Sequence, residues 1–161
     1  MKRFSAFFLT FLCSLTLVFA QMVNPVKWTH TSKQSGNELT LTFTAAIERG
    51  WHMYGLQPPE GGPQQTEFAY DNLDGAKLHG PVKVVKGSII SQYDDAFDMK
   101  LSYYENNMTV EQKFILTDSE YNIEGYITYM SCCDGMCTPP TTYDFKVNGK
   151  NNAPAASTDE P

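Results

Sequence analysis

The chain has 161 residues and a formal net charge of −6, from 18 acidic and 12 basic side chains. An acidic chain without a basic cluster is a poor candidate for binding nucleic acid or an anionic membrane surface, because its net charge repels both. The length suits one domain with its own hydrophobic core.

Residues 1–20 have the pattern of a signal peptide. Lys2 and Arg3 form a basic start, a mostly apolar run follows, and Ala20 supplies the small residue expected before a cleavage site. The apolar run is too short, and too closely followed by polar sequence, to favour a membrane-spanning helix. We therefore expect an exported, periplasmic domain over residues 21–148, without a membrane span, in a compartment where disulfides persist.

Most of the remaining sequence alternates between apolar and polar residues, as half-buried antiparallel strands do. The clearest case is Glu38–Glu48, in which every second residue is apolar. We expect strands at Val26–Ser32, Glu38–Glu48, Trp51–Tyr54, Thr66–Tyr70, Ala76–Val85 (one broken strand or two), Lys100–Glu105, Met108–Leu116, Tyr121–Met130 and Thr141–Val147. About eight or nine short strands without a helical period predict an all-β, immunoglobulin-like sandwich.

Four segments interrupt this pattern. Gln57–Gln65 holds three prolines and two glycines and is expected to be a loop. Ser91–Met99 is polar and is expected to be irregular. Asn106-Asn107 is expected to be the turn of a hairpin between its flanking strands. Residues 149–161 are polar and unpatterned, which predicts a disordered tail or linker.

The segment Tyr129–Pro140, YMSCCDGMCTPP, holds three cysteines. A bond between Cys132 and Cys137 would close a ring of about six residues, which stabilises by only roughly 2 kcal/mol in the loop-entropy picture. A bond that only held the domain together would more usefully join distant strands, so this spacing favours a reactive pair. Asp134-Gly135 would let the segment fold back. Cys133 is then the odd thiol, because a bond to its neighbour Cys132 would need a strained ring.

The residues leave two other uses of this segment open. One is an inert secreted sandwich with a structural disulfide. The other is a soft-metal site, because Met130, Met136 and the three thiols would suit Cu(I). Zinc is less attractive, since the segment has no histidine and no second cysteine pair. We predict no cofactor and no resident metal.

The C-x4-C spacing, followed by x-P-P and an alternating strand, resembles the amino-terminal domain of the thiol:disulfide interchange protein DsbD. The resemblance covers Pro25 to about Val147. Further matching stretches are PVKWT at Pro25–Thr29, IERGWHMYGLQPPEGGP at Ile47–Pro63 and YDDAFDMKLSYYE at Tyr93–Glu105. The family fold is an immunoglobulin-like sandwich, in agreement with the strand pattern.

The resemblance implies a protein-disulfide reductase-type activity with Cys132 and Cys137 as the redox pair. Cys137 would receive the partner's attack and Cys132 would resolve the mixed disulfide. Partners would be thioredoxin-like periplasmic proteins and a membrane electron donor. The family motif has no cysteine at Cys133, so a Cys133–Cys137 pairing stays open. Full-length relatives continue into a membrane electron-transfer segment and a thioredoxin-like domain. The sequence is then either a stand-alone version or an incomplete chain, and its electron donor would be another protein.

The resemblance also implies a set of residues around the disulfide. Phe97 would be the aromatic ring of a cap loop that excludes small oxidants and reductants until a partner displaces it. His52 and Tyr54 would lie beside the site. Asp94 and Asp95 are read as solvated loop charges, and Asp95 as a neighbour of the site. Their negative charge would raise the pKa of a nearby thiol.

Overall fold

The computed structural model describes residues 23–56, 60–95 and 97–152. The predicted signal peptide and residues 153–161 of the predicted tail lie outside this range. Within it the structure has 13 strands, all paired antiparallel. No helix in these ranges has the length and apolar character to cross a membrane.

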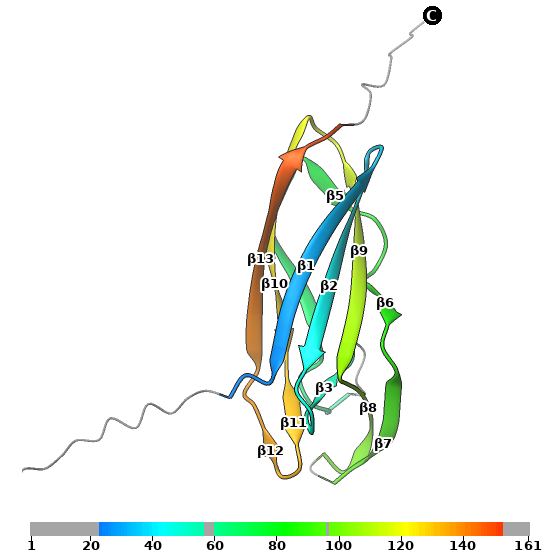
Figure 1. Ribbon diagram of the computed structural model, residues 1–161, viewed down its shortest axis with the longest axis vertical. Coiled ribbons are helices and arrows are strands. Elements are labelled where there is room, and N and C mark those ends of the chain that lie inside the picture. The colour runs from blue at the N-terminus through cyan, green and yellow to red at the C-terminus, as the bar shows by residue number, and fades with distance from the viewer. Residues whose placement is uncertain (1–22, 57–59, 96, 153–161) are drawn as a thin grey trace, which may run out of the picture.

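The strands form three sheets (Figure 1). The strands are β1 Val26–Ser35, β2 Glu38–Ile47, β3 His52–Tyr54, β4 Glu67–Asp74, β5 Ala76–Leu78, β6 Lys83–Lys86, β7 Ile89–Asp94, β8 Met99–Glu105, β9 Asn107–Leu116, β10 Glu120–Tyr129, β11 Ser131–Cys133, β12 Met136–Cys137 and β13 Thr141–Lys150. The first sheet has the order β1-β2-β9-β5, with β6 also paired to β9. The second has the order β13-β10-β4 and the third β12-β11-β3-β8-β7.

The first and second sheets pack face to face around the main core. Alternation places one side of each strand inside this core. The fully buried residues that share this inward face include Leu39, Leu41, Phe43, Ala45, Ile123 and Ile127. Phe43 of β2 reaches across to the second sheet, where its ring centroid lies 4.8 Å from Phe145 and 5.3 Å from Phe68. The predicted all-β sandwich is therefore confirmed.

The third sheet lies at one end of this sandwich, at the lower end in Figure 1. It has two differently used faces. Met53 and Tyr104 are paired across β3 and β8, and both belong to the main core. Their neighbours Tyr54 and Tyr103 are also paired, and they form a second small cluster with Leu101 and Cys132. The period of two along each strand therefore turns one face of the third sheet toward the core and the other toward the cysteines.

Two sequence expectations were wrong. Ser91–Met99 is not irregular throughout, because its first four residues belong to strand β7, Ile89–Asp94, which forms a hairpin with β8. This strand is at the edge of its sheet and mostly exposed, so its sequence lacks the hydrophobic alternation of the core strands. Asn106-Asn107 does not close a hairpin either, because β8 pairs with β3 and β7 whereas β9 pairs with β2, β5 and β6. Asn106 has a φ of 62° and carries the chain from the third sheet to the first.

Other boundaries differ by a few residues. The predicted strand Ala76–Val85 is two strands, β5 and β6, and both pair with β9. The last strand, β13, continues to Lys150, which is paired with Glu120, so it extends into the predicted tail.

Candidate redox site

The cysteine segment folds into a short hairpin. Its arms are β11 and β12, and its turn contains Gly135 at a φ of 81°, a backbone conformation that glycine adopts without strain. Cys132 lies opposite Cys137 in the strand register, and their sulfurs are bonded with an S–S distance of 2.00 Å. Cys133 lies opposite Met136 and is a free thiol. The bonded pair is therefore the one that the resemblance implied.

The two bonded cysteines differ in burial. Cys132 is only 3% exposed and belongs to the second cluster, whereas Cys137 is exposed on the edge strand β12. Thr138 closes the base of the hairpin, since its backbone N–H donates to the Ser131 carbonyl at 2.9 Å. An incoming thiol can therefore approach Cys137 from solvent, while Cys132 is covered by its neighbours.

The Tyr54 hydroxyl lies between the buried cysteine and a carboxylate. It is 3.4 Å from the Sγ of Cys132 and 3.1 Å from Oδ2 of Asp94, with geometry suited to donation to either. Its single proton is thus shared between the two acceptors. Burial, followed by the charge of Asp94, raises the pKa of Tyr54, so this hydroxyl keeps its proton at physiological pH.

His52 adjoins this hydroxyl on the same face of β3. Its Nε2 lies 3.4 Å from the Tyr54 oxygen, and its ring centroid lies 4.3 Å from that of Tyr103. Burial lowers the pKa of His52, so the imidazole is neutral at pH 7. Three carboxylates oppose this shift, those of Asp94, Glu105 and Asp134. A neutral imidazole can donate to Tyr54 or accept from it, depending on the tautomer.

Phe97 packs against the second cluster from the tip of the β7–β8 hairpin. Its ring centroid lies 6.0 Å from that of Tyr54, with the rings almost perpendicular. The backbone N–H of Phe97 donates to Oδ1 of Asp94 at 3.3 Å. Asp94 therefore joins this segment to the Tyr54 hydroxyl through its two carboxylate oxygens, and reading it as a solvated charge was wrong. Asp95 is exposed.

Asp94 was missed because its segment was read as irregular. On β7 it follows Ile90 and Gln92 at intervals of two, and Ile90 lies opposite Tyr103 of the cluster. Residues at intervals of two share one face of a strand, so reading this segment as a strand would have predicted that Asp94, like Ile90, faces the cysteines and that Asp95 faces away from Tyr54.

An open groove of about 530 Å³ runs beside the disulfide. Its lining comprises both bonded cysteines, the free thiol, His52, Tyr54, residues 92–95 at the end of β7, and residues 134–136 of the cysteine hairpin. The charged side chains in this lining are Asp94, Asp95 and Asp134, and none of the described residues that line it is Lys or Arg. The groove therefore presents a negative surface to any partner that reaches the disulfide. In the described part of the chain, no group of three or more His, Cys, Asp or Glu side chains is placed to hold a metal ion.

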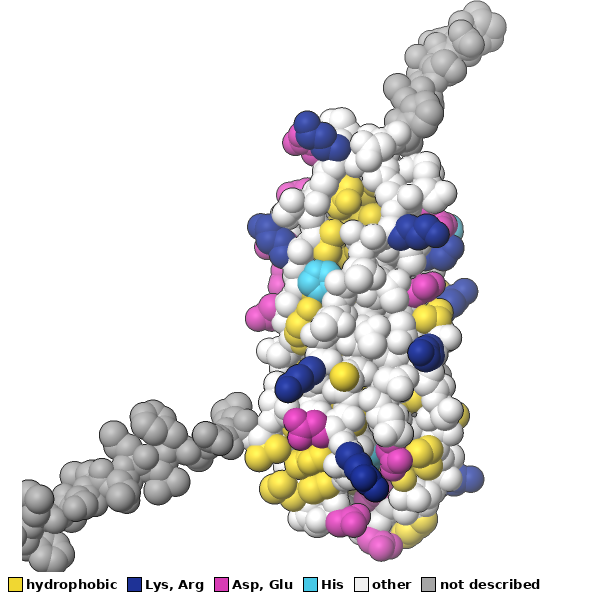
Figure 2. Space-filling view, in the orientation of Figure 1, with side chains coloured by type: hydrophobic (Ala, Val, Ile, Leu, Met, Phe, Trp, Pro, Cys, Tyr) yellow, Lys and Arg dark blue, Asp and Glu magenta, His cyan; other side chains and the backbone are white. Residues whose placement is uncertain are grey.

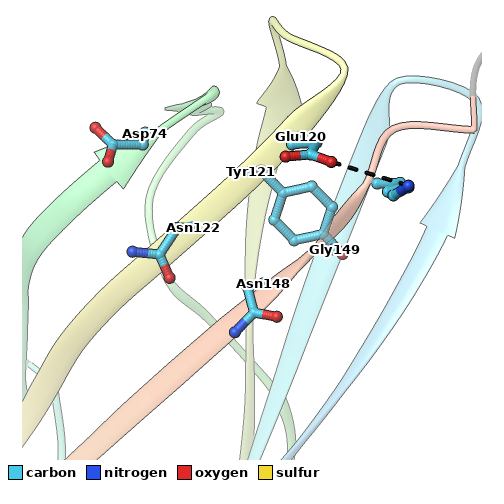
Figure 3. A pocket seen from close by; sticks show the side chains of 7 residues that line it. Asp74, Glu120, Tyr121, Asn122, Asn148 and Gly149 are labelled. Atoms are coloured by element: carbon cyan, nitrogen blue, oxygen red, sulfur yellow. Dashed lines mark ion pairs between the residues drawn. The ribbon is translucent and has the colours of Figure 1, made fainter.

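A different hollow, of about 420 Å³, lies where β4, β10 and β13 meet near Lys150 (Figure 3). Asp74, Asn122 and Asn148 form one row across these three strands. The ion pair between Glu120 and Lys150, at 3.9 Å, lies at its rim. Its lining contains no cysteine or histidine among the described residues, so it is separate from the redox site.

Comparison with known proteins agrees with this fold. Two solved structures share the fold: the reduced DsbD N-terminal domain of Neisseria meningitidis (20% identity, 78% of this chain and 85% of that chain, TM-score 0.50) and the N-terminal periplasmic domain of ScsB from Proteus mirabilis (18%, 84% and 50%, TM-score 0.57). The chain thus spans half the length of the ScsB domain. No curated protein matches it. The model of the family "Thiol:disulfide interchange protein DsbD, N-terminal" matches residues 20–149, and the chain therefore belongs to this family.

Proposed function

We propose that this protein is a periplasmic thiol:disulfide oxidoreductase that passes reducing equivalents through Cys132 and Cys137. The observation that carries the proposal is the unequal environment of one disulfide, with an exposed sulfur at Cys137 and a buried sulfur beside the Tyr54 hydroxyl. Exchange needs one sulfur that can be attacked and a second that can leave and return. Family membership supports the same reaction class.

In the reducing half-reaction a donor thiolate attacks Sγ of Cys137. The bond between Cys137 and Cys132 breaks, its electron pair stays on Cys132 as a thiolate, and a mixed disulfide joins Cys137 to the donor. The second donor thiolate then attacks the donor sulfur of this mixed disulfide. Cys137 is released as a thiolate, and the donor leaves as a disulfide after giving up two electrons.

In the oxidising half-reaction the Cys137 thiolate attacks the disulfide of the partner to be reduced. One partner sulfur leaves as a thiolate and takes up a proton. Cys132 then attacks Sγ of Cys137, reforms the Cys132–Cys137 bond and releases the second partner sulfur. The partner has gained two electrons and two protons, and the protein has returned to its oxidised form.

The residues around Cys132 stabilise the charge that forms on its sulfur. In the oxidised protein the Tyr54 proton is shared between Asp94 and Sγ of Cys132. When Cys132 becomes a thiolate, a hydrogen bond to the charged sulfur is stronger than one to a neutral disulfide sulfur. Tyr54 is therefore proposed to direct its proton to the leaving sulfur. Phe97 is proposed to cover the site until a partner displaces it.

The finer identity of the partners follows from the family and the expected signal peptide. We propose a thioredoxin-like protein as the substrate to be reduced and a membrane protein as the electron donor. Both would meet the disulfide from the solvent side of β12, where Cys137 is exposed.

Trapping the mixed disulfide tests the roles of the two cysteines. Reduced Cys132→Ser and Cys137→Ser variants, both in a Cys133→Ser background, are incubated with oxidised glutathione, and adducts are located by peptide mapping. We expect rapid, stable glutathionylation of Cys137 in the first variant and much slower reaction of buried Cys132 in the second. Equal rates in the two variants, or no adduct on Cys137, would contradict the proposal.

A further inference from the structure

Cys137 lies between two hollows of opposite character. On one side is the acidic groove described above. On the other is a small pocket of about 160 Å³ with a mostly apolar lining: Val23, Trp51, Met136, Cys137, Thr138, Pro139 and Thr141. Met136 and Cys137 line both hollows and form the ridge between them. Figure 2 shows hydrophobic side chains gathered at this end of the molecule, beside the start of the described chain.

The pocket exposes apolar surface that none of the described residues covers. Val23 is 50% exposed and Met136 is 49% exposed, whereas Trp51 is partly buried against the main core. The main core therefore supports the Trp51 wall of the pocket, whereas Val23 and Met136 form walls that are half exposed to solvent. An apolar hollow of this size, with part of its wall in solvent, gains free energy when another apolar side chain fills it.

We infer that this pocket binds the apolar side chain next to the reacting cysteine of a partner, while the acidic groove takes positive charge from the same partner. The inference rests on the proposed function and adds partner selection to it. A sulfur that attacks Cys137 brings its neighbouring residues with it, since consecutive Cα atoms are about 3.8 Å apart. A side chain next to the reacting cysteine is therefore within reach of the pocket that Cys137 lines.

Charge selects the partner on the other side of Cys137. Asp94, Asp95 and Asp134 line the groove without a Lys or Arg among its described lining residues. The whole chain is acidic as well, with a net charge of −6. A partner with basic side chains near its reactive cysteine is attracted to this surface, and an acidic partner is repelled. The combined surface therefore favours a cysteine that has an apolar neighbour and a basic flank.

Peptide thiols test this preference directly. Oxidised full-length mature protein is mixed with four peptides, each of which contains a single cysteine. The residues on both sides of the cysteine are either Phe or Ser, and the next residues outward are either Lys or Glu. Every rate is divided by the rate of the same peptide with 2-hydroxyethyl disulfide, which corrects for differences in thiol reactivity. We expect the Phe peptide to react about tenfold faster than the Ser peptide, as burial of part of one side chain predicts. We expect Lys to be favoured over Glu, and this difference to shrink in high salt.

Matched variants assign the preference to the pocket. In Met136→Glu the Phe and Ser peptides should react at equal corrected rates, whereas Met136→Leu should keep the faster reaction of the Phe peptide. Val85→Glu is the control, because Val85 is 51% exposed on β6 and lies outside the pocket. Wild-type protein that reacts equally fast with Phe and Ser peptides would overturn the inference and leave the proposed function standing. A disulfide that neither the peptides nor dithiothreitol can open would overturn the proposed function as well.

Discussion

Removing one oxygen atom at Tyr54 tests the environment of the buried sulfur. Tyr54→Phe keeps the ring, which is only 1% exposed and packs in the second cluster, and deletes the donor that lies 3.4 Å from Cys132. Asp94 keeps the backbone N–H of Phe97 as a partner. The variant should therefore fold, and it should make Cys132 a poorer leaving group.

The size of the effect follows from the hydrogen bond that is lost. A hydrogen bond to a charged group contributes about 1.5–3 kcal/mol, and we take the lower end because Asp94 competes for the same proton. Exchange transition states carry roughly half of the sulfur charge, so the expected loss in rate is about threefold rather than tenfold. Since loss of the Tyr54–Asp94 contact would also loosen the segment around Phe97, the substitution is compared in wild-type and Phe97→Ala backgrounds.

The assay is reduction of the oxidised protein by dithiothreitol. Samples are alkylated at intervals, and the number of alkylated cysteines in each is determined by mass spectrometry. Tyr103→Phe is the control, because Tyr103 lies opposite Tyr54 in the strand register and belongs to the same cluster. We expect slower reduction of Tyr54→Phe in the Phe97→Ala background and a nearly unchanged rate for Tyr103→Phe. Equal rates for the Tyr54 and Tyr103 variants would refute the role given to the Tyr54 hydroxyl.

Three further outcomes are expected. Phe97→Ala should speed reduction by dithiothreitol several-fold, because the cap then covers the disulfide less completely, and an unchanged rate would exclude a lid. Burial holds the pKa of His52 below its ordinary 6.5, so as the pH falls this imidazole is protonated in the unfolded chain before it is protonated in the folded protein. The free energy of unfolding should therefore decrease as the pH drops below 6.5, by at most about 1.4 kcal/mol per pH unit. Urea midpoints at about pH 7.5 and 5.5 should show this loss in wild type and less of it in His52→Gln. Gly125→Ala should cost about 2 kcal/mol or more in urea, because its Cβ would lie 2.2 Å from the Ala69 carbonyl oxygen, and it should leave the dithiothreitol rate of folded protein unchanged.

The strands of the main sandwich were predictable because each has one face in the core and one in solvent. Along β2 every second residue from Leu39 to Ile47 is apolar, and all five of these residues are buried. The pairing of Cys132 with Cys137 was predictable by resemblance, and the register of β11 and β12 explains it physically, because the two residues lie directly opposite each other.

The third sheet was harder to predict because its strands are short or exposed. β7 has only Ile90 packed on the second cluster, so its sequence resembles a loop. Asn106 carries the residue type of a hairpin turn, but the same left-handed backbone serves a crossing between sheets, and only tertiary packing distinguishes the two. The position of Asp94 depends on β7, so the link between the cap and Tyr54 could not be predicted without that strand.

The proposed function requires the Cys132–Cys137 bond to open and close reversibly as a working redox couple. An equilibrium titration of the wild-type protein against dithiothreitol buffers of graded potential, with alkylated cysteines located by mass spectrometry, tests it directly. We expect one two-electron transition above about −300 mV in which Cys132 and Cys137 become alkylated together. A bond that stays closed below that potential, or a transition in which Cys133 replaces either partner, would contradict it.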